Sequence, residues 1–320
     1  MFANYFYQTE PQVPDTGGNL VNYNAFDVTR AYLNVSGNIS HIVAFRITPD
    51  VNRETNPASS LNGSLTFRLK YAYLQTNLDD WMTKGSFARF GIQQTPYLDY
   101  TEGIYRYRFQ GTMFVERNNY FASADAGASF HWNFPSNFGD VHVGLFNGEN
   151  YNKAEANDRK AFSVRATVRP FASMAPIARG LRATFFYDGD DYLENAERTR
   201  AIGQLSFEHK YAVLGFEYLS AKDRPTASTA AVESDGYSIW LTPRSAIGWE
   251  GLLRYDHLTP NRSQALESRK QNRTIVGVAY WFPHQRDVSA ALMLDYDAES
   301  LKNISSVPAR RVAIHALVSF

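Results

Sequence analysis

Apolar and polar residues alternate with a period of two along almost the whole chain. The pattern is strict at residues 65–73 and recurs at 162–169, 237–241 and 288–296. A period of two is typical of β-strands with one apolar face, whereas a helix would repeat about every 3.6 residues. The sequence therefore predicts an all-β chain.

Turn-forming residues divide this pattern into strands. The predicted strands start near Phe2, Phe26, Ile39, Ser64, Phe87, Phe121, Asp140, Lys160, Leu181, Arg198, Tyr211, Gly236, Trp249, Asn272, Val288 and Ala309. The predicted strand near Phe2 is short, over residues 2–8, and a break of parity around Arg30 predicts a β-bulge in the next strand.

Short and long connections alternate between these strands. The predicted long connections are 11–24, 50–63, 95–120, 148–157, 189–197, 221–235, 259–271 and 298–308. Short turns on one side and long loops on the other are typical of bacterial membrane barrels. We expect one domain over residues 1–320, a transmembrane antiparallel up-and-down β-barrel of about 16 strands with short periplasmic turns and long outer loops.

The last predicted strand, residues 311–320, carries an apolar face that ends on Phe320. Such a strand resembles the closing strand of bacterial outer-membrane β-barrels. The resemblance implies an outer-membrane location with both termini periplasmic. Residues 1–4 lack the charged and apolar regions of a signal peptide, so we expect a mature chain.

The amino-acid composition excludes several kinds of site and partner. The 320 residues include no cysteine, which excludes disulfides and thiolate metal sites, and 32 basic residues balance 32 acidic ones, so no basic footprint predicts nucleic-acid binding. No apolar run is long enough for a transmembrane helix. The mean hydropathy of −0.38 still fits a barrel, because its lipid-facing and lumen-facing residues average out.

The polar face of the strands is rich in cations, above all in the first half of the chain. We expect it to line a water-filled lumen in which rows of arginine and lysine favour anions. An alternative is that these cations pair with inward carboxylates and only hold water. The candidate anion path comprises Arg30, Arg46, Arg68, Lys70, Arg89, Arg165 and Arg169.

Residues 95–120 form the longest predicted loop, and loops of this length are usually functional. We expect it to fold inward and narrow the pore, with Arg106, Arg108, Glu116 and Arg117 as the constriction residues. The alternative is a surface loop in which Glu116 and Arg117 pair locally.

Aromatic residues gather towards the predicted strand ends, as an interfacial girdle would require. The alternative is a sugar-stacking track. The set comprises Tyr71, Tyr73, Phe207, Tyr218, Tyr255, Tyr280, Trp281 and Phe282.

Several short motifs resemble the phosphate-selective porin O and P family. They are Phe87–Tyr97 followed by Val115–Arg117, the early Asp27–Gly37 segment, Val143–Gly148 and Val164–Phe171. The resemblance implies a homotrimeric channel of sixteen strands in outer-membrane lipid, with preference for small anionic or other hydrophilic solutes. Phosphate specificity is not implied, because Lys70 and Lys84 are almost the only lysines of the first half.

No other motif predicts chemistry. Asp188–Asp191 lacks the spacing of a calcium loop, the seven histidines show no paired metal spacing, and no Gly-x-Ser-x-Gly elbow is present. We therefore expect a passive diffusion channel with no enzyme activity, metal or cofactor. The alternative is a barrel without a channel, either a structural anchor or an envelope lipase with a serine bonded to His131, His142 or His315.

Overall fold

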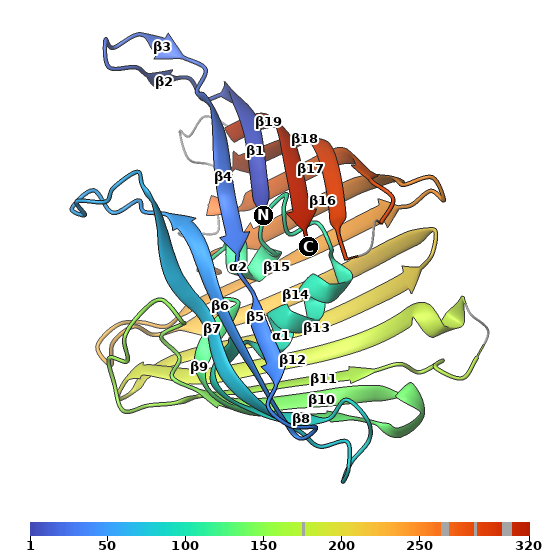
Figure 1. Cartoon of the computed structure of the whole chain (residues 1–320). Helices are drawn as coiled ribbons and strands as arrows, with labels where there is room; N and C mark the ends of the chain where they lie inside the picture. The colour runs from blue at the N-terminus through green and yellow to red at the C-terminus, as the bar shows by residue number, and fades with distance from the viewer. Residues whose placement is uncertain (175–176, 264–268, 285–286, 303–308) are drawn as a thin grey trace.

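A computed structural model of the chain describes residues 1–174, 177–263, 269–284, 287–302 and 309–320. Its strands form one closed antiparallel barrel, with two helices inside the ring (Figure 1). The first strands are β1 (Phe2–Glu10), β4 (Asn24–Tyr32), β5 (Val35–Asn38), β6 (Val43–Arg53), β7 (Leu65–Asn77), β8 (Phe87–Gln94), β9 (Ala124–Asn133), β10 (Gly139–Phe146) and β11 (Ala161–Val168).

The later strands are β12 (Leu181–Leu193), β13 (Ala196–His209), β14 (Ala212–Asp223), β15 (Val232–Pro243), β16 (Trp249–Thr259), β17 (Gln271–Trp281), β18 (Ser289–Leu301) and β19 (Ala309–Ser319). The helices are α1 (Pro96–Ile104) and α2 (Phe114–Arg117), with short 3-10 turns at Pro135–Asn137 and Ala178–Gly180. No helix in the described ranges is long and apolar enough to cross a membrane.

The sheet holds 17 strand segments, of which β4 and β5 are two halves of one strand against β6. The barrel therefore has 16 strands, as the alternation predicted. The strand near Phe2 is real, because β1 closes the ring by pairing with both β19 and β4. The amino group of Met1 donates to the Val318 carbonyl at 2.7 Å, so the two termini lie side by side.

The outer surface of the barrel is apolar on every side. Large side chains exposed there include Phe26, Phe67, Phe90, Leu145, Phe162, Phe185, Leu205, Leu214, Ile239, Leu253, Val276, Leu292 and Ile314. Apart from the short segment β5, whose pairing is with β6, each barrel strand has neighbours on both edges, so most backbone groups are paired within the sheet and this surface can face lipid.

The bulge predicted near Arg30 is present. Phe2 pairs with Arg30 and Ala3 with Val28, so Thr29 is the extra residue. The strand is then interrupted at Asn34, whose side-chain oxygen accepts hydrogen bonds from Arg46 Nη2 at 2.8 Å and Thr48 Oγ1 at 2.9 Å.

A second bulge, in β7, contradicts the prediction that Tyr71 and Tyr73 belong to an interfacial girdle. Thr48 pairs with Tyr71 and Pro49 with Leu69, which leaves Lys70 as the extra residue of β7. Pro49 has no N–H to donate to the ladder, which favours an irregularity at this point. The inverted parity turns Tyr71 and Tyr73 into the lumen, where they contact Arg46 and Arg89.

The prediction of a long loop over residues 189–197 is also wrong. Strands β12 and β13 continue to a tight turn in which Leu193 pairs with Ala196. The extension is stabilised by charge, because Arg198 bridges to Asp190 across the hairpin. The loop after β1 contains its own hairpin of β2 (Val13–Pro14) and β3 (Leu20–Val21), which projects from the barrel (Figure 1).

Candidate functional site

Residues 95–123, which we name the inner loop, fold into the barrel and pack against one side of its wall. Apolar loop side chains at 0–1% exposure are Tyr97, Leu98, Tyr105, Tyr107, Met113, Phe114 and Val115. They share one apolar cluster with Phe186, Ile202, Leu219, Trp240, Leu252 and Ile275 from β12–β17. Burial of these aromatic and aliphatic side chains is the main force that holds the loop inside.

Wall carboxylates bind polar groups of the loop. The Tyr97 hydroxyl donates to Glu217 of β14. Glu250 of β16 accepts from Arg106 Nη2 at 2.6 Å and from the Tyr107 hydroxyl at 2.8 Å. These bonds satisfy buried carboxylates that would otherwise lose their solvation.

Wall arginines bind the loop backbone. Arg165 of β11 donates to the Pro96 carbonyl at 3.0 Å and Arg200 of β13 to the Tyr120 carbonyl at 3.1 Å. Arg254 of β16 donates to the Thr112 carbonyl at 3.2 Å. We name the inward face of β11–β18 the covered wall, because the inner loop removes much of it from the lumen.

The opposite side of the lumen carries the basic row, which we define as Arg30, Arg46, Arg68, Lys70 and Arg89 on β4–β8. Arg30 and Arg68 share one carboxylate, Asp50, at 2.7 and 3.0 Å. In the described part of the chain, Arg46 and Lys70 form no ion pair. They lie over the ring of Tyr71, at 4.7 and 5.4 Å from its centroid.

Arg89 completes the basic row and is its link to the inner loop. Its guanidinium lies 3.6 Å from Asp99 of α1 and 4.9 Å from the centroid of the Tyr73 ring. It also donates to Gln75 at 2.9 Å. The aromatic and amide partners orient the cation without neutralising it, and Asp99 is its one carboxylate partner among the described residues.

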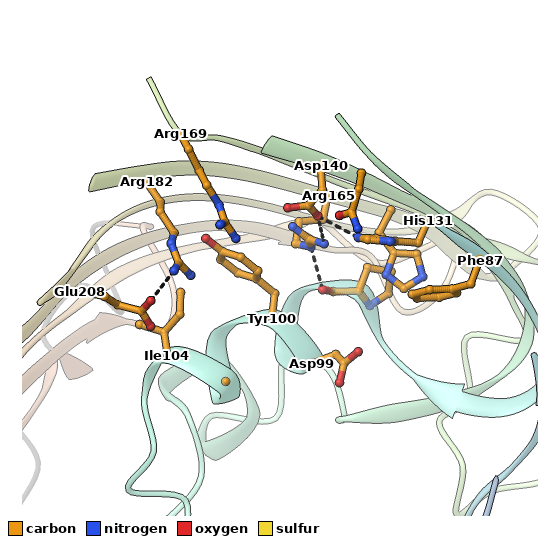
Figure 2. Close-up of a pocket in the computed structure, with 14 residues that line it drawn as sticks. Phe87, Asp99, Tyr100, Ile104, His131, Asp140, Arg165, Arg169, Arg182 and Glu208 are labelled. Atoms are coloured by element: carbon orange, nitrogen blue, oxygen red, sulfur yellow. Dashed lines mark hydrogen bonds and ion pairs between the residues drawn. The ribbon is translucent and has the colours of Figure 1, made fainter. Parts of the chain in front are cut away.

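Two cavities lie on opposite sides of the inner loop. The long-loop cavity has a volume of about 590 Å³ and is lined by charged residues that include Arg30, Arg68, Arg117, Lys153, Arg198 and Glu116. The short-turn cavity has about 430 Å³ and contains the remaining path candidates, Arg165 and Arg169 (Figure 2). Of the seven predicted path residues, Arg30 and Arg68 line the long-loop cavity, and Arg165 and Arg169 line the short-turn cavity.

The predicted constriction residues are all held by partners. Arg106 bonds Glu250 and stacks 3.7 Å over the Trp281 ring. Arg117 lies 3.8 Å from Asp256 of β16. Both arginines therefore face the covered wall. Trp281 lies inside the barrel, not in the interfacial aromatic girdle predicted from the sequence.

Arg108 and Glu116 bind each other within the loop. Arg108 pairs with Glu102 at 2.8 Å and with Glu116 at 3.1 Å. Local pairing of Glu116 with Arg117, the alternative considered from the sequence, is not the arrangement found here.

Burial changes the acidity of loop groups. It raises the pKa of Glu102 above the usual range, although Arg108 opposes the shift, and Glu116 adds to it. Burial lowers the pKa of Arg117 to about 10, with the charges of Arg254 and Arg273 acting in the same direction. Arg117 remains a cation at neutral pH.

A serine does contact one of the histidines considered as bases, but the geometry excludes catalysis by the pair. His142 Nε2 lies 3.0 Å from Ser129 Oγ, which itself lies 2.6 Å from Gln93 Oε1. The Gln93 amide nitrogen donates to the Gly127 carbonyl, which fixes its oxygen as the acceptor for the serine proton. The hydroxyl has one proton to give, so His142 donates to it and is not its base. Both side chains face the lumen rather than lipid.

Within the described ranges, no cluster of three or more histidine, aspartate or glutamate side chains could hold a metal ion. Asp188 and Asp190 instead face inward and bind Ser163 and Arg198.

Sequence reasoning missed Asp50, Asp99 and Tyr100. Asp50 was placed at the start of a loop, although it belongs to β6. The other two lie on α1, whose start does carry a signal. Thr95 followed by Pro96 and then Asp99 is a favourable helix N-terminus, with proline in the first turn and an acidic residue near the positive end of the helix dipole.

The sequence pattern of the family described as phosphate-selective porin O and P matches residues 7–210, which is more than half of the chain. The chain belongs to this family. It is therefore an outer-membrane porin, a channel rather than an enzyme, which also removes the anchor and lipase alternatives. No curated protein has a sequence that matches this porin significantly.

Solved structures similar to this porin share its fold at low identity. The outer-membrane channel DcaP of Acinetobacter baumannii is 12% identical, with a TM-score of 0.62, and the match covers 98% of this chain and 93% of that one. The anion-selective porin from Comamonas acidovorans is 11% identical, with a TM-score of 0.61 and coverage of 99% and 98%. OmpT of Vibrio cholerae in its trimer form is 11% identical, with a TM-score of 0.61 and coverage of 99% and 97%.

Proposed function

We propose that this porin passes small anions more readily than cations. The observation that carries the proposal is the excess of cations in the basic row. Arg30 and Arg68 share the single carboxylate of Asp50. Arg46 and Lys70 form no ion pair with the described residues. A row of cations along a pore lowers the energy of a passing anion and raises that of a cation.

The long-loop cavity supports the same preference. Five cations and one carboxylate, Glu116, are among its lining residues. Asp50, Asp256 and Asp190 compensate three of these cations and Glu116 pairs with Arg108, so two positive charges remain. Fixed charge of one sign in a cleft raises the local concentration of the opposite ion. Anions would therefore accumulate at this mouth before they reach the basic row.

The inner loop is the proposed constriction. It occupies the covered side of the lumen and reaches the opposite wall where Asp99 lies 3.6 Å from Arg89. The space beside the basic row is therefore the path that we assign to solutes. Arg108 contributes little free charge to it, because Glu102 and Glu116 both bind its guanidinium.

Orientation and assembly complete the proposal. The termini and the short turns would face the periplasm, as in barrels with short periplasmic turns and long outer loops. We also propose a homotrimer, supported by the likeness to OmpT of Vibrio cholerae in its trimer form. Light scattering of the detergent-solubilised protein should give the mass of three chains, and the mass of one chain would contradict this assembly.

Reversal potential in a planar bilayer under a KCl gradient tests the selectivity. The wild type should favour chloride, and Arg46→Gln should lower the chloride preference by about threefold, since a unit charge roughly 6 Å away in water contributes about 0.7 kcal/mol. The matched control is Lys210→Gln in the short turn between β13 and β14, which removes one charge from outside the lumen. Cation preference of the wild type would overturn the proposal.

Phosphate is the solute in the family description, and its passage is a separate question. Replacing chloride with phosphate on one side of the bilayer measures the relative permeability directly. We expect phosphate to carry current but not to be favoured over chloride, because Lys70 is the one lysine of the basic row. A strong preference for phosphate would show that arginines alone can form a phosphate path here.

A further inference from the structure

The short-turn cavity has the features of a binding site in its own right. Its wall residues come from the short-turn ends of β8–β13, and α1 closes the opposite side (Figure 2). The volume of about 430 Å³ lies in the range of small-molecule sites. Asp99, one of its lining residues, lies 3.6 Å from Arg89 of the basic row.

The carboxylates around this cavity already have cationic partners. Asp140 binds Arg165 and also His131 Nε2, the latter at 3.1 Å. Glu208 binds Arg182. Asp99 faces Arg89 at 3.6 Å. None of these carboxylates is left to neutralise a further cation.

Arg169 is that further cation. Its Nη1 donates to the Asn137 side-chain oxygen at 2.8 Å, and it forms no ion pair with any described residue. Figure 2 shows its guanidinium pointing into the cavity, close to the hydroxyl end of Tyr100. The cavity therefore holds one positive charge without a counter-charge.

Three buried donors that line the cavity have no hydrogen-bond partner in the protein. They are Arg169 Nε, Arg182 Nε and the Tyr100 hydroxyl. The Tyr100 ring is held in place by Arg165, whose guanidinium carbon lies 4.5 Å from the ring centroid. Buried donors nearly always have a partner, so this group is suited to a ligand that brings acceptors.

We propose that the short-turn cavity binds the carboxylate of a small organic anion through Arg169 and the Tyr100 hydroxyl. The inference deepens the proposed anion function and rests on it for the arrival of the ligand. A planar carboxylate offers two oxygens to a guanidinium and accepts a phenol proton, and its single charge matches the single uncompensated cation.

The remaining lining favours an anion with an apolar body over a bare oxyanion. Phe87, Ile104 and the face of the Tyr100 ring are part of the cavity surface. Contact with these groups stabilises the bound ligand, because it removes apolar ligand surface from water. Benzoate, which joins a carboxylate to one aromatic ring, is the probe that we choose.

Titration calorimetry on the detergent-solubilised full chain should show saturable binding of benzoate to the wild type. Arg169→Gln should weaken this binding at least tenfold, and Tyr100→Phe by about three- to tenfold, because each removes a hydrogen bond to a charged ligand. The control is Arg179→Gln, which changes an exposed residue in the turn beyond β11. Unchanged binding in both cavity variants would overturn the assignment.

A second measurement uses the wild type alone. Benzoate added on the side of the short turns should reduce chloride conductance at a lower concentration than benzoate added on the other side. Phosphate should block at least tenfold more weakly. Equal block from both sides, or stronger block by phosphate, would refute the site as proposed. If the channel prefers chloride but does not bind benzoate, this inference is wrong and the proposed function stands. If the channel prefers cations but binds benzoate through Arg169, the proposed function is wrong and the binding site stands.

Discussion

The covered wall of β11–β18 and the basic row of β4–β8 have similar sequences and different surroundings. Both place their charged residues mainly on the inward face, whose positions alternate with apolar outward ones. On the covered wall, Glu217, Glu250 and Arg254 bind loop groups. On the opposite side, Arg46 and Lys70 lack ion-pair partners among the described residues.

This difference teaches that an inward charge in a barrel can serve two purposes. Where a loop lies over the wall, the charge anchors that loop and loses its influence on passing ions. Where no loop lies over the wall, a charge such as that of Arg46 is screened by solvent and mobile ions, so it acts on solutes. Lys70 is the exception in the basic row, because it is 3% exposed. Each prediction below changes one side and leaves the other intact.

The largest expected effect comes from Trp240→Ala on the covered wall. Trp240 is 1% exposed and packs edge-on against Tyr105 of the inner loop. Loss of this buried side chain should destabilise the fold by about 3–5 kcal/mol and loosen the loop, with larger single-channel conductance. Urea unfolding in detergent gives the first quantity, and bilayer recordings give the second.

The control for that variant is Phe90→Ala, which removes an aromatic side chain from the outer face of β8, where Phe90 is 73% exposed. Its conductance should equal that of the wild type. If Phe90→Ala and Trp240→Ala changed conductance alike, the loop would not be held by the covered wall.

A smaller effect is expected from Arg106→Gln. This change removes the bond to Glu250 and the stacking on Trp281. Because the guanidinium is partly exposed, we expect a loss of about 1–2 kcal/mol in unfolding free energy. Ion selectivity should stay that of the wild type, measured by reversal potential, since the charge acts on the loop. A large change in selectivity would place Arg106 in the ion path.

The smallest effect is expected on the other side, from Asp50→Asn. The substitution frees Arg30 and Arg68 from their shared carboxylate. Chloride preference should rise by about two- to threefold, as one lumen charge contributes about 0.7 kcal/mol at roughly 6 Å in water. A fall in chloride preference on bilayer reversal-potential measurement would mean that these two arginines do not face the path.

Sequence alone predicted much of the barrel, because alternation acts on every strand and turns leave strong local signals. The first strand, β1, was recognised correctly, and its pairing with β19 closes the ring. Tyr71 and Tyr73 were placed wrongly because one extra residue, Lys70, inverts the parity of β7. Such a bulge depends on the partner strand and Pro49, which the pattern of β7 does not contain.

The candidate site was less predictable. The seven path residues were chosen because alternation along the strands places them on the inward face, and their role as an anion path stays a prediction. Arg106 and Arg117 were expected to face the pore but face Glu250 and Asp256, because the loop docks through its buried aromatic residues. Docking of a loop on distant strands is a tertiary effect, and no local pattern in residues 95–120 encodes its direction.

The most direct test compares two single-charge variants, Arg46→Gln in the basic row and Arg106→Gln on the inner loop, by reversal potential under the same KCl gradient. Arg46→Gln should reduce chloride preference by about threefold, and Arg106→Gln should leave it unchanged. Equal shifts in both variants, or a shift confined to Arg106→Gln, would contradict the assignment of the anion path to the basic row.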